Sequence, residues 1–165
     1  MLVTPGFQRR SLLAVDSCER GRRSRCVATW SDRDGQGERA QDGREVASSA
    51  PRVIAGHIAH ISEVLEESGF SDSCPVSPIT IEIGNASEQV RLACRRFFYS
   101  WRTALATKLN ERGMDLARSR RLADLVVYAT EGALIVCRAE RGLDALRLVS
   151  EEMGVLCESA SGQRV

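Results

Sequence analysis

Apolar residues recur at three- and four-residue steps over most of the chain from residue 48 onward, which is the spacing of one face of an α-helix. The first predicted helix has Ser48 or Ser49 as its N-cap, Pro51 in its first turn and Gly69 as its stop. Its apolar face consists of Val53, Ile54, His57, Ile58, Ile61, Val64 and Leu65.

The strongest amphipathic pattern runs from Ser87 to Gly113. Ser87 predicts an N-cap, with Glu88 and Gln89 in the first turn. The apolar residues of this helix are Val90, Cys94, Phe97, Phe98, Trp101, Leu105 and Leu109.

A third helix is predicted from about Asp115 to Arg138, and its second half, LADLVVYATEGALIVC, is apolar nearly all the way round. Such a helix must be covered on every side, so one flank needs a partner beyond its own domain. Tyr128 and Glu131 are the polar exceptions, and at three residues apart they are neighbours on the helix surface. They either satisfy each other or nearby backbone, or they provide a polar group in a pocket.

The fourth predicted helix, roughly Leu143 to Cys157, has apolar residues at 3-4-3 spacing, which suits packing against another helix at a shallow angle. The excess of apolar residues on the last two helices predicts a homodimer, in which these helices of both subunits form a four-helix bundle. The predicted interface residues are Leu122, Leu125, Val126, Ala133, Leu134, Leu146, Val149, Met153 and Leu156.

The stretch SDSCPVSPITIEIGNASEQV, residues 71–90, carries signals of both strand and helix. Isoleucines at 79, 81 and 83 alternate with polar residues, as in a half-buried strand. A lone strand would leave its backbone groups without hydrogen-bond partners. Pro75 and Pro78 also suit a first helical turn, where N–H groups have no intrahelical acceptor. We therefore predict a short helix from Pro75 to Gly84, with its isoleucines toward a pocket or the core.

Residues 1–49 are rich in Arg, Gly, Asp and Ser and have no sustained apolar period. Such a segment buries too little surface to offset its chain entropy, so we expect it to be disordered or weakly ordered. Its arginines are interleaved with acids, which cancels most of a phosphate-binding stripe. The predicted organisation is a low-complexity segment over 1–49, a helical domain over 50–158 and a tail over 159–165.

Composition narrows the possible partners. The net charge of +1 provides no overall field toward nucleic acid or membrane. No apolar run approaches the length of a membrane span, and the patch at 12–15 is too short for a signal peptide, so a cytoplasmic protein without membrane contact is expected. The six cysteines form no CxxC pair and the two histidines lack zinc-finger spacing, so we expect reduced thiols and neither a metal nor another cofactor.

Three stretches resemble the C-terminal regulatory domain of TetR-type transcriptional regulators, in the branch of the lincomycin-resistance repressor. They are SCPVSPITIEI, LACRRFFYSWRTALATKLNERG and LADLVVYATEGALIVCRAERGLDALRLV. The resemblance covers roughly residues 50–158, with Ser73 where glycine is usual. The matching motifs are Cys74-Pro75, Phe98 to Trp101, Glu131-Gly132-Ala133 and Arg138.

The resemblance implies an all-α bundle of about five helices that dimerises through the last two and binds a small apolar or amphipathic effector. A bound effector would favour a spacing of the DNA-binding heads that does not fit the operator. The expected pocket walls are apolar with few polar groups, and core packing is an equally good interpretation of each residue. They are His57, Ile61, Ile83, Cys94, Phe97, Phe98, Trp101, Tyr128 and Ala129.

The N-terminal segment departs from this family, whose members begin with a helix-turn-helix of about fifty residues. Residues 1–49 show no such pattern and contain no lysine. The DNA-binding half is therefore absent or replaced, and DNA is expected as a partner only if a helix-turn-helix is supplied. One hypothesis is that the segment is a shifted reading frame of the missing domain, which an intact helix-turn-helix in another frame of the upstream DNA would support.

Three functional hypotheses follow. The first is a TetR-type regulator, in this family usually a repressor, or the remnant of one. The alternative is a helical dimer that binds no DNA and acts as a ligand-binding or interaction module. An enzyme is disfavoured, with no catalytic residue assigned, because the acids are scattered, the Ser and Thr residues lack a base and there is no glycine-rich phosphate loop.

Overall fold

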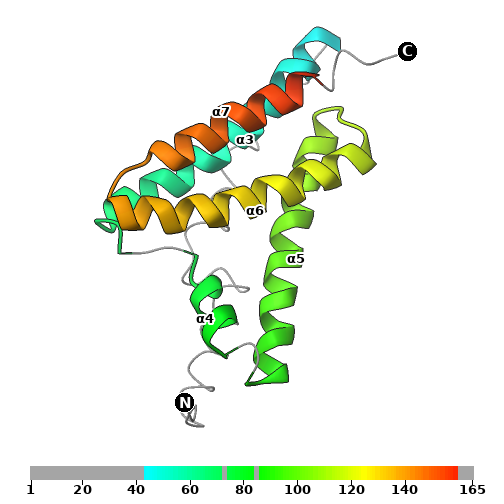
Figure 1. The fold of residues 1–165 in the computed structure, drawn as a ribbon. Helices are drawn as coiled ribbons and strands as arrows, with labels where there is room; N and C mark the ends of the chain where they lie inside the picture. The colour runs from blue at the N-terminus through cyan, green and yellow to red at the C-terminus, as the bar shows by residue number, and fades with distance from the viewer. Residues whose placement is uncertain (1–42, 72–73, 84–85, 160–165) are drawn as a thin grey trace.

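The computed structural model describes residues 43–71, 74–83 and 86–159, and the side chains of 50–71, 74–82 and 86–158. This part of the chain contains helices and no strand, which confirms the all-α prediction (Figure 1). The helices are α3 (Gly43–Glu67), α4 (Val76–Ile83), α5 (Glu88–Glu111), α6 (Leu116–Glu140) and α7 (Asp144–Ser159). None of them is both long and apolar enough to cross a membrane.

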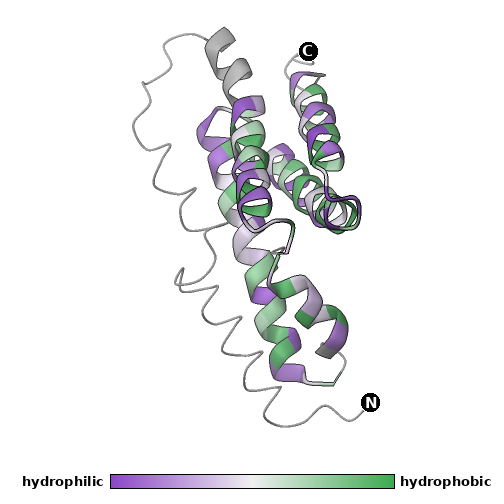
Figure 2. Ribbon diagram, turned by 90° about the vertical axis from the view of Figure 1, so that its left-hand side faces the viewer, coloured by the Kyte–Doolittle hydropathy of each residue, from purple (hydrophilic) through white to green (hydrophobic). Residues whose placement is uncertain are grey.

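Helix α6 lies at the centre of the fold and packs against both α5 and α7. Helices α3 and α7 run side by side, while α5 extends away from this layer and carries the short α4 beside it (Figure 1). Apolar and polar residues alternate in bands along the helices, as expected where each helix turns one face to its neighbours (Figure 2).

One apolar core connects the helices. Its fully buried side chains come from every described helix, and they include Ile54, Leu65, Val76, Val90, Leu105, Leu109, Leu122, Val126 and Leu146. At about 25 cal/mol per Å² of apolar surface, burial of these side chains is the main contribution to the stability of the fold.

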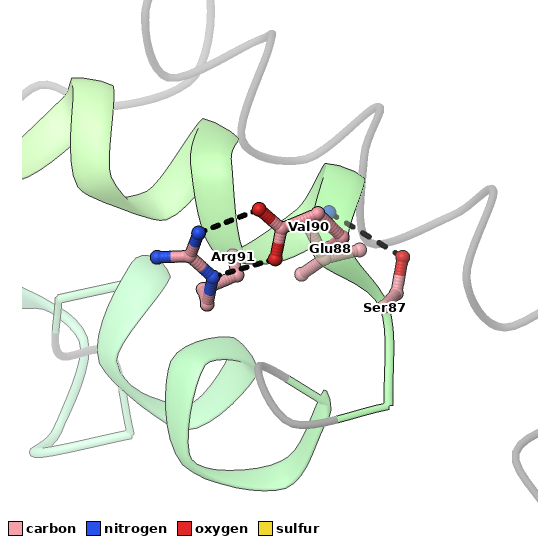
Figure 3. Close-up of polar contacts among 4 residues, drawn as sticks. All are labelled: Ser87, Glu88, Val90 and Arg91. Carbon is pink, nitrogen blue, oxygen red and sulfur yellow. Dashed lines mark hydrogen bonds and ion pairs between the residues drawn. The ribbon is translucent and has the colours of Figure 1, made fainter.

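Capping residues fix the starts of α5 and α6. The hydroxyl of Ser87 accepts a hydrogen bond from the backbone N–H of Val90 at 3.4 Å, beside the Glu88–Arg91 ion pair at 2.6 Å (Figure 3). The carboxylate of Asp115 accepts from the N–H of Arg118 at 3.0 Å. Each cap provides an acceptor for a backbone N–H group that has none within the helix. The predicted N-cap at Ser87 is confirmed.

The predicted start of the first helix is wrong. Helix α3 begins at Gly43, so neither Ser48 nor Ser49 is its N-cap, and Pro51 lies inside the helix. The rule that places proline in a first turn rests on its missing N–H group. An interior proline removes one backbone hydrogen bond and clashes with the preceding turn, at a cost of about 3 kcal/mol. Helix formation on both sides of Pro51 outweighs that cost here.

The other helix boundaries agree closely with the sequence pattern. Helix α3 ends near Gly69, whose φ of 61° is the left-handed conformation of a helix stop. The stretch after Cys74 is the short helix α4, which confirms helix over strand. Of the predicted low-complexity segment 1–49, residues 43–49 belong to α3, while residues 1–42 lie outside the described ranges, as do residues 160–165 of the predicted tail.

Candidate functional site

A hollow of about 700 Å³ lies between the turn after α3, the helix α4 and the second half of α6. We call it the α4–α6 hollow. Its apolar lining includes Phe70, Pro78, Ile81, Leu134 and Ile135, and its polar lining includes Cys74, Ser77, Glu82, Glu131, Arg138 and Arg141. An apolar wall with a few polar groups is typical of small-molecule sites.

The turn after α3 places Phe70 at the hollow. Gly69 and Phe70 both have positive φ, at 61° and 63°, and the N–H of Phe70 donates to the carbonyl of Leu65 at 2.9 Å. The left-handed conformation costs a non-glycine residue about 1–2 kcal/mol. The packing of Phe70 against the apolar core offsets that cost and fixes one wall of the hollow.

Glu131 on α6 contributes a polar contact to the hollow. Its Oε2 accepts a hydrogen bond from the hydroxyl of Ser77 on α4, which joins two helices that are 54 residues apart in sequence. Its Oε1 is shielded from solvent and has no hydrogen-bond partner among the described residues. A buried acceptor without a donor costs about 1–3 kcal/mol, so this oxygen is a point at which a donor would be stabilised.

Cys74 lies buried beside the same carboxylate. Burial raises the pKa of its thiol, and the charge of Glu131 and a hydrogen bond to it raise that pKa further. The thiol therefore stays protonated at neutral pH and is not an activated nucleophile. Its place in the hollow fits a role in packing and weak hydrogen bonding.

Five of the predicted pocket residues are buried in the core and do not line the hollow. These are His57, Ile61, Cys94, Phe97 and Trp101. The indole N–H of Trp101 donates to Nε2 of His57 at 3.1 Å, and their ring centroids lie 5.6 Å apart. Burial, and then the charges of His60 and Lys108, lower the pKa of His57 to about 4, so the imidazole is neutral near pH 7.

The remaining predicted pocket residues lie elsewhere. Phe98 and Ala129 are half-buried. The side chain of Ile83 is not among the side chains that the structure describes. Tyr128 is exposed, and its hydroxyl accepts from the Arg102 guanidinium at 2.8 Å. Tyr128 and Glu131 therefore have different partners, and of the two only Glu131 lines the α4–α6 hollow.

The sequence pattern indicated Glu131 and the helix after Cys74 as parts of a pocket, but it did not indicate Phe70, Ser77 or Leu134 as pocket residues. Phe70 reaches the hollow through a strained turn, and Ser77 through a contact across 54 residues of sequence. The available signal was the position of Ser77 between Pro75, just before α4, and Pro78 within it.

The family described as transcriptional regulator LmrA/YxaF-like, C-terminal domain, matches residues 50–152. The chain belongs to this TetR-type family. Two uncharacterized HTH-type transcriptional regulators of Mycobacterium tuberculosis, Rv0196 of strain H37Rv and MT0206 of strain CDC 1551, are each 27% identical to the chain over 89 residues. These matches cover 51% of the chain and 46% of each relative, so the chain spans about half their length. No solved structure matches significantly.

Several residues of the predicted dimer interface are buried within the single chain and are not available to a second subunit. Leu122, Val126, Ala133, Leu134 and Leu146 are buried in its own core, while Val149 and Met153 are half-buried. The periodicity of an almost fully apolar helix cannot separate the flank that faces its own core from the flank that remains exposed. Of the predicted residues only Leu125 and Leu156 are exposed, and the exposed apolar side chains beside them are Ile135, Val136, Leu148 and Val155.

Proposed function

We propose that the chain is the effector-binding and dimerisation part of a cytoplasmic TetR-type transcriptional repressor and has no enzymatic activity. The observation that carries the proposal is a family-typical regulatory domain with a partly apolar hollow at α4 and α6. A small apolar or amphipathic molecule in this hollow would contact Phe70, Ile81 and Leu134.

The proposed dimer uses the exposed apolar residues of α6 and α7. Since α6 packs against α7, these residues lie on neighbouring helices of one layer. Exposed apolar patches of this kind commonly mark sites of association, and closed two-fold pairing is the commonest arrangement. Pairing of both helices with those of a second copy would form a four-helix bundle. The residues are Leu125, Ile135, Val136, Leu148, Val155 and Leu156.

An effector would act by binding one arrangement of the dimer better than another, because a ligand shifts an equilibrium only through its differential affinity. The Ser77–Glu131 hydrogen bond links α4, one wall of the hollow, to α6, which also carries part of the proposed interface. A shift of α4 on binding would therefore reach the helix that sets the spacing of the two subunits. DNA binding requires a helix-turn-helix to be supplied with this domain.

Light scattering on the full chain tests the dimer. We expect a dimer at tens of micromolar, and a monomer for Leu148→Glu, which puts a charge into the proposed interface. Thr107→Glu on the exposed side of α5 is the matched control and should remain a dimer. A monomeric wild-type chain at this concentration would remove the proposed bundle.

The second candidate is a dimer that binds ligand or a partner protein but no DNA. It is favoured by the composition of residues 1–49, which shows no helix-turn-helix pattern. A mobility-shift assay with DNA from upstream of its own gene distinguishes the two functions. DNA that is retarded by the chain and released by a ligand would exclude the second candidate.

A further inference from the structure

The α4–α6 hollow contains one polar atom that the protein itself leaves without a partner. Oε1 of Glu131 is shielded from solvent, while Oε2 of the same carboxyl group accepts from Ser77. In proteins such orphan acceptors are uncommon, and each calls for an explanation such as a bound group. Glu131 lines the hollow, so a bound molecule that shifts the side chains covering Oε1 can form a hydrogen bond with it.

The neighbouring side chains do not supply a strong donor. The hydroxyl of Ser77 has one proton, and it is already donated to Oε2. The thiol of Cys74 hydrogen-bonds the same carboxylate, but a thiol is only a weak donor. Arg138 and Arg141 also line the hollow, but both are exposed to solvent. The rest of the inner wall, including Phe70 and Leu134, is apolar.

We propose that the effector is an apolar molecule that carries one hydrogen-bond donor, a hydroxyl or an amine N–H, and that this donor binds Oε1 of Glu131. The proposal rests on the proposed function of the α4–α6 hollow as the effector site. The apolar body of the molecule lies against Phe70, Ile81 and Leu134, which gives affinity without strong selectivity. Glu131 gives the selectivity.

The selectivity follows from an asymmetry in hydrogen bonding. A site built around a buried acceptor favours a ligand with a donor, because an analogue without the donor leaves that acceptor desolvated and unpaired. A purely apolar wall discriminates much more weakly between molecules of the same shape. Replacement of a donor by a methyl ether should therefore weaken binding far more than its change in size would.

Three probes of matched shape test this on the full chain, namely 2-naphthylmethanol, its methyl ether and 2-naphthylmethylamine. Titration calorimetry gives a dissociation constant for each. We expect the alcohol or the amine to bind at least about tenfold more tightly than the ether, the effect of one hydrogen bond to a charged group. A tighter amine would identify a cationic effector, and a tighter alcohol a neutral one, and both results support a donor.

Variants then locate the contact. Glu131→Met keeps the length of the side chain and removes the acceptor, so the preference over the ether should fall to about twofold or less. Glu82→Met is the matched control, because Glu82 lines the same hollow but is exposed, and it should keep the preference. A preference that survives in Glu131→Met would overturn the proposal.

The wild-type titrations decide the proposal even if Glu131→Met does not fold. Equal affinity for the ether and for both donors would overturn the inference while leaving the hollow as an apolar effector site. Failure of all three probes to bind at millimolar concentration would overturn the proposed effector site itself, and with it the inference.

Discussion

Two polar contacts join distant segments of this domain, and they differ in what surrounds them. Trp101 and His57 connect α5 to α3 across 44 residues, and both side chains are at least 95% buried, with 5% and 1% exposure. Ser77 and Glu131 connect α4 to α6 across 54 residues, but one carboxyl oxygen has no partner and the pair borders the α4–α6 hollow.

The difference separates a structural contact from a candidate binding contact. A sealed polar pair inside an apolar core stabilises one arrangement of the helices, because loss of either partner leaves the other desolvated. A carboxylate with one unpaired oxygen beside a hollow can still accept a hydrogen bond from a bound molecule. Perturbation of the first contact should therefore affect mainly stability, and perturbation of the second mainly ligand selectivity.

The largest expected effect is that of Trp101→Ala, which should lower the free energy of unfolding by about 3–5 kcal/mol. The substitution empties a core position and removes the donor to Nε2 of His57. Urea denaturation measures the change. Tyr99→Ala, on the same helix but 65% exposed, is the control and should change stability by less than about 0.5 kcal/mol. Similar losses of unfolding free energy for both variants would contradict the assignment of Trp101 to the core.

Acidification should weaken the same contact. The pKa of His57 is about 4 in the folded chain and 6.5 as its ordinary value, so between these pH values the unfolded chain binds more protons. The free energy of unfolding should fall as the pH drops from 6.5 and level off below about 4, with a total loss of about 3 kcal/mol.

Carboxyl groups titrate in part of that range, so the His57 effect is isolated by comparison with His57→Gln. The glutamine retains an acceptor for the Trp101 indole but does not titrate. Unfolding curves at several pH values should show a shallower dependence for this variant between pH 6.5 and 5. Parallel pH profiles for the two proteins would remove His57 as the cause.

Ser77→Ala should have a smaller effect, a loss of about 1–2 kcal/mol in the unfolding free energy. It removes the hydroxyl donor to Oε2 of Glu131 and leaves the carboxylate with the weaker thiol donor of Cys74. Thermal unfolding measures the loss, with Thr80→Val on the same helix as the control, since the Thr80 hydroxyl bonds only the backbone carbonyl of Val76. A loss in Ser77→Ala no larger than in the control would show that the α4–α6 contact does not contribute to stability.

The smallest effect is expected for Tyr128→Phe, at most about 0.5 kcal/mol. Tyr128 lies one turn before Glu131 on α6, but it is 57% exposed and its hydroxyl bond to Arg102 competes with water. Denaturant titration of this variant beside Ser77→Ala compares an exposed and a shielded contact on one helix. An equal or larger loss for Tyr128→Phe would reverse the ranking.

The helices themselves could be predicted from the sequence because their causes are local. Ser87 as the cap of α5, Gly69 as the stop of α3 and the helical state of the stretch after Cys74 all follow from nearest-neighbour backbone chemistry. The start of α3 could not be predicted, because proline at position 51 is tolerated within a longer helix. Family membership could also be predicted, because it rests on the order and spacing of short motifs.

The candidate site depended on contacts that periodicity does not encode. The aromatic face of α5 suggested a pocket, but Phe97 and Trp101 fill the core. Similarly, the apolar spacing of α6 and α7 identified helices with excess apolar surface, while the fold determined that Leu122 and Leu146 face inward and Leu125 and Leu148 outward. Cores and apolar pockets are lined by the same types of residue, so only the packing of the folded chain shows which residues lie in which.

The sequence alone therefore determined the all-α class, the approximate extent of the helices and the family, since these depend on local spacing and short motifs. The tertiary structure decided which polar groups meet and which remain open. Glu131 is one polar residue in an apolar helix until Ser77 approaches it from a segment 54 residues away. That approach satisfies one carboxyl oxygen, while the other is shielded from solvent without a hydrogen-bond partner among the described residues.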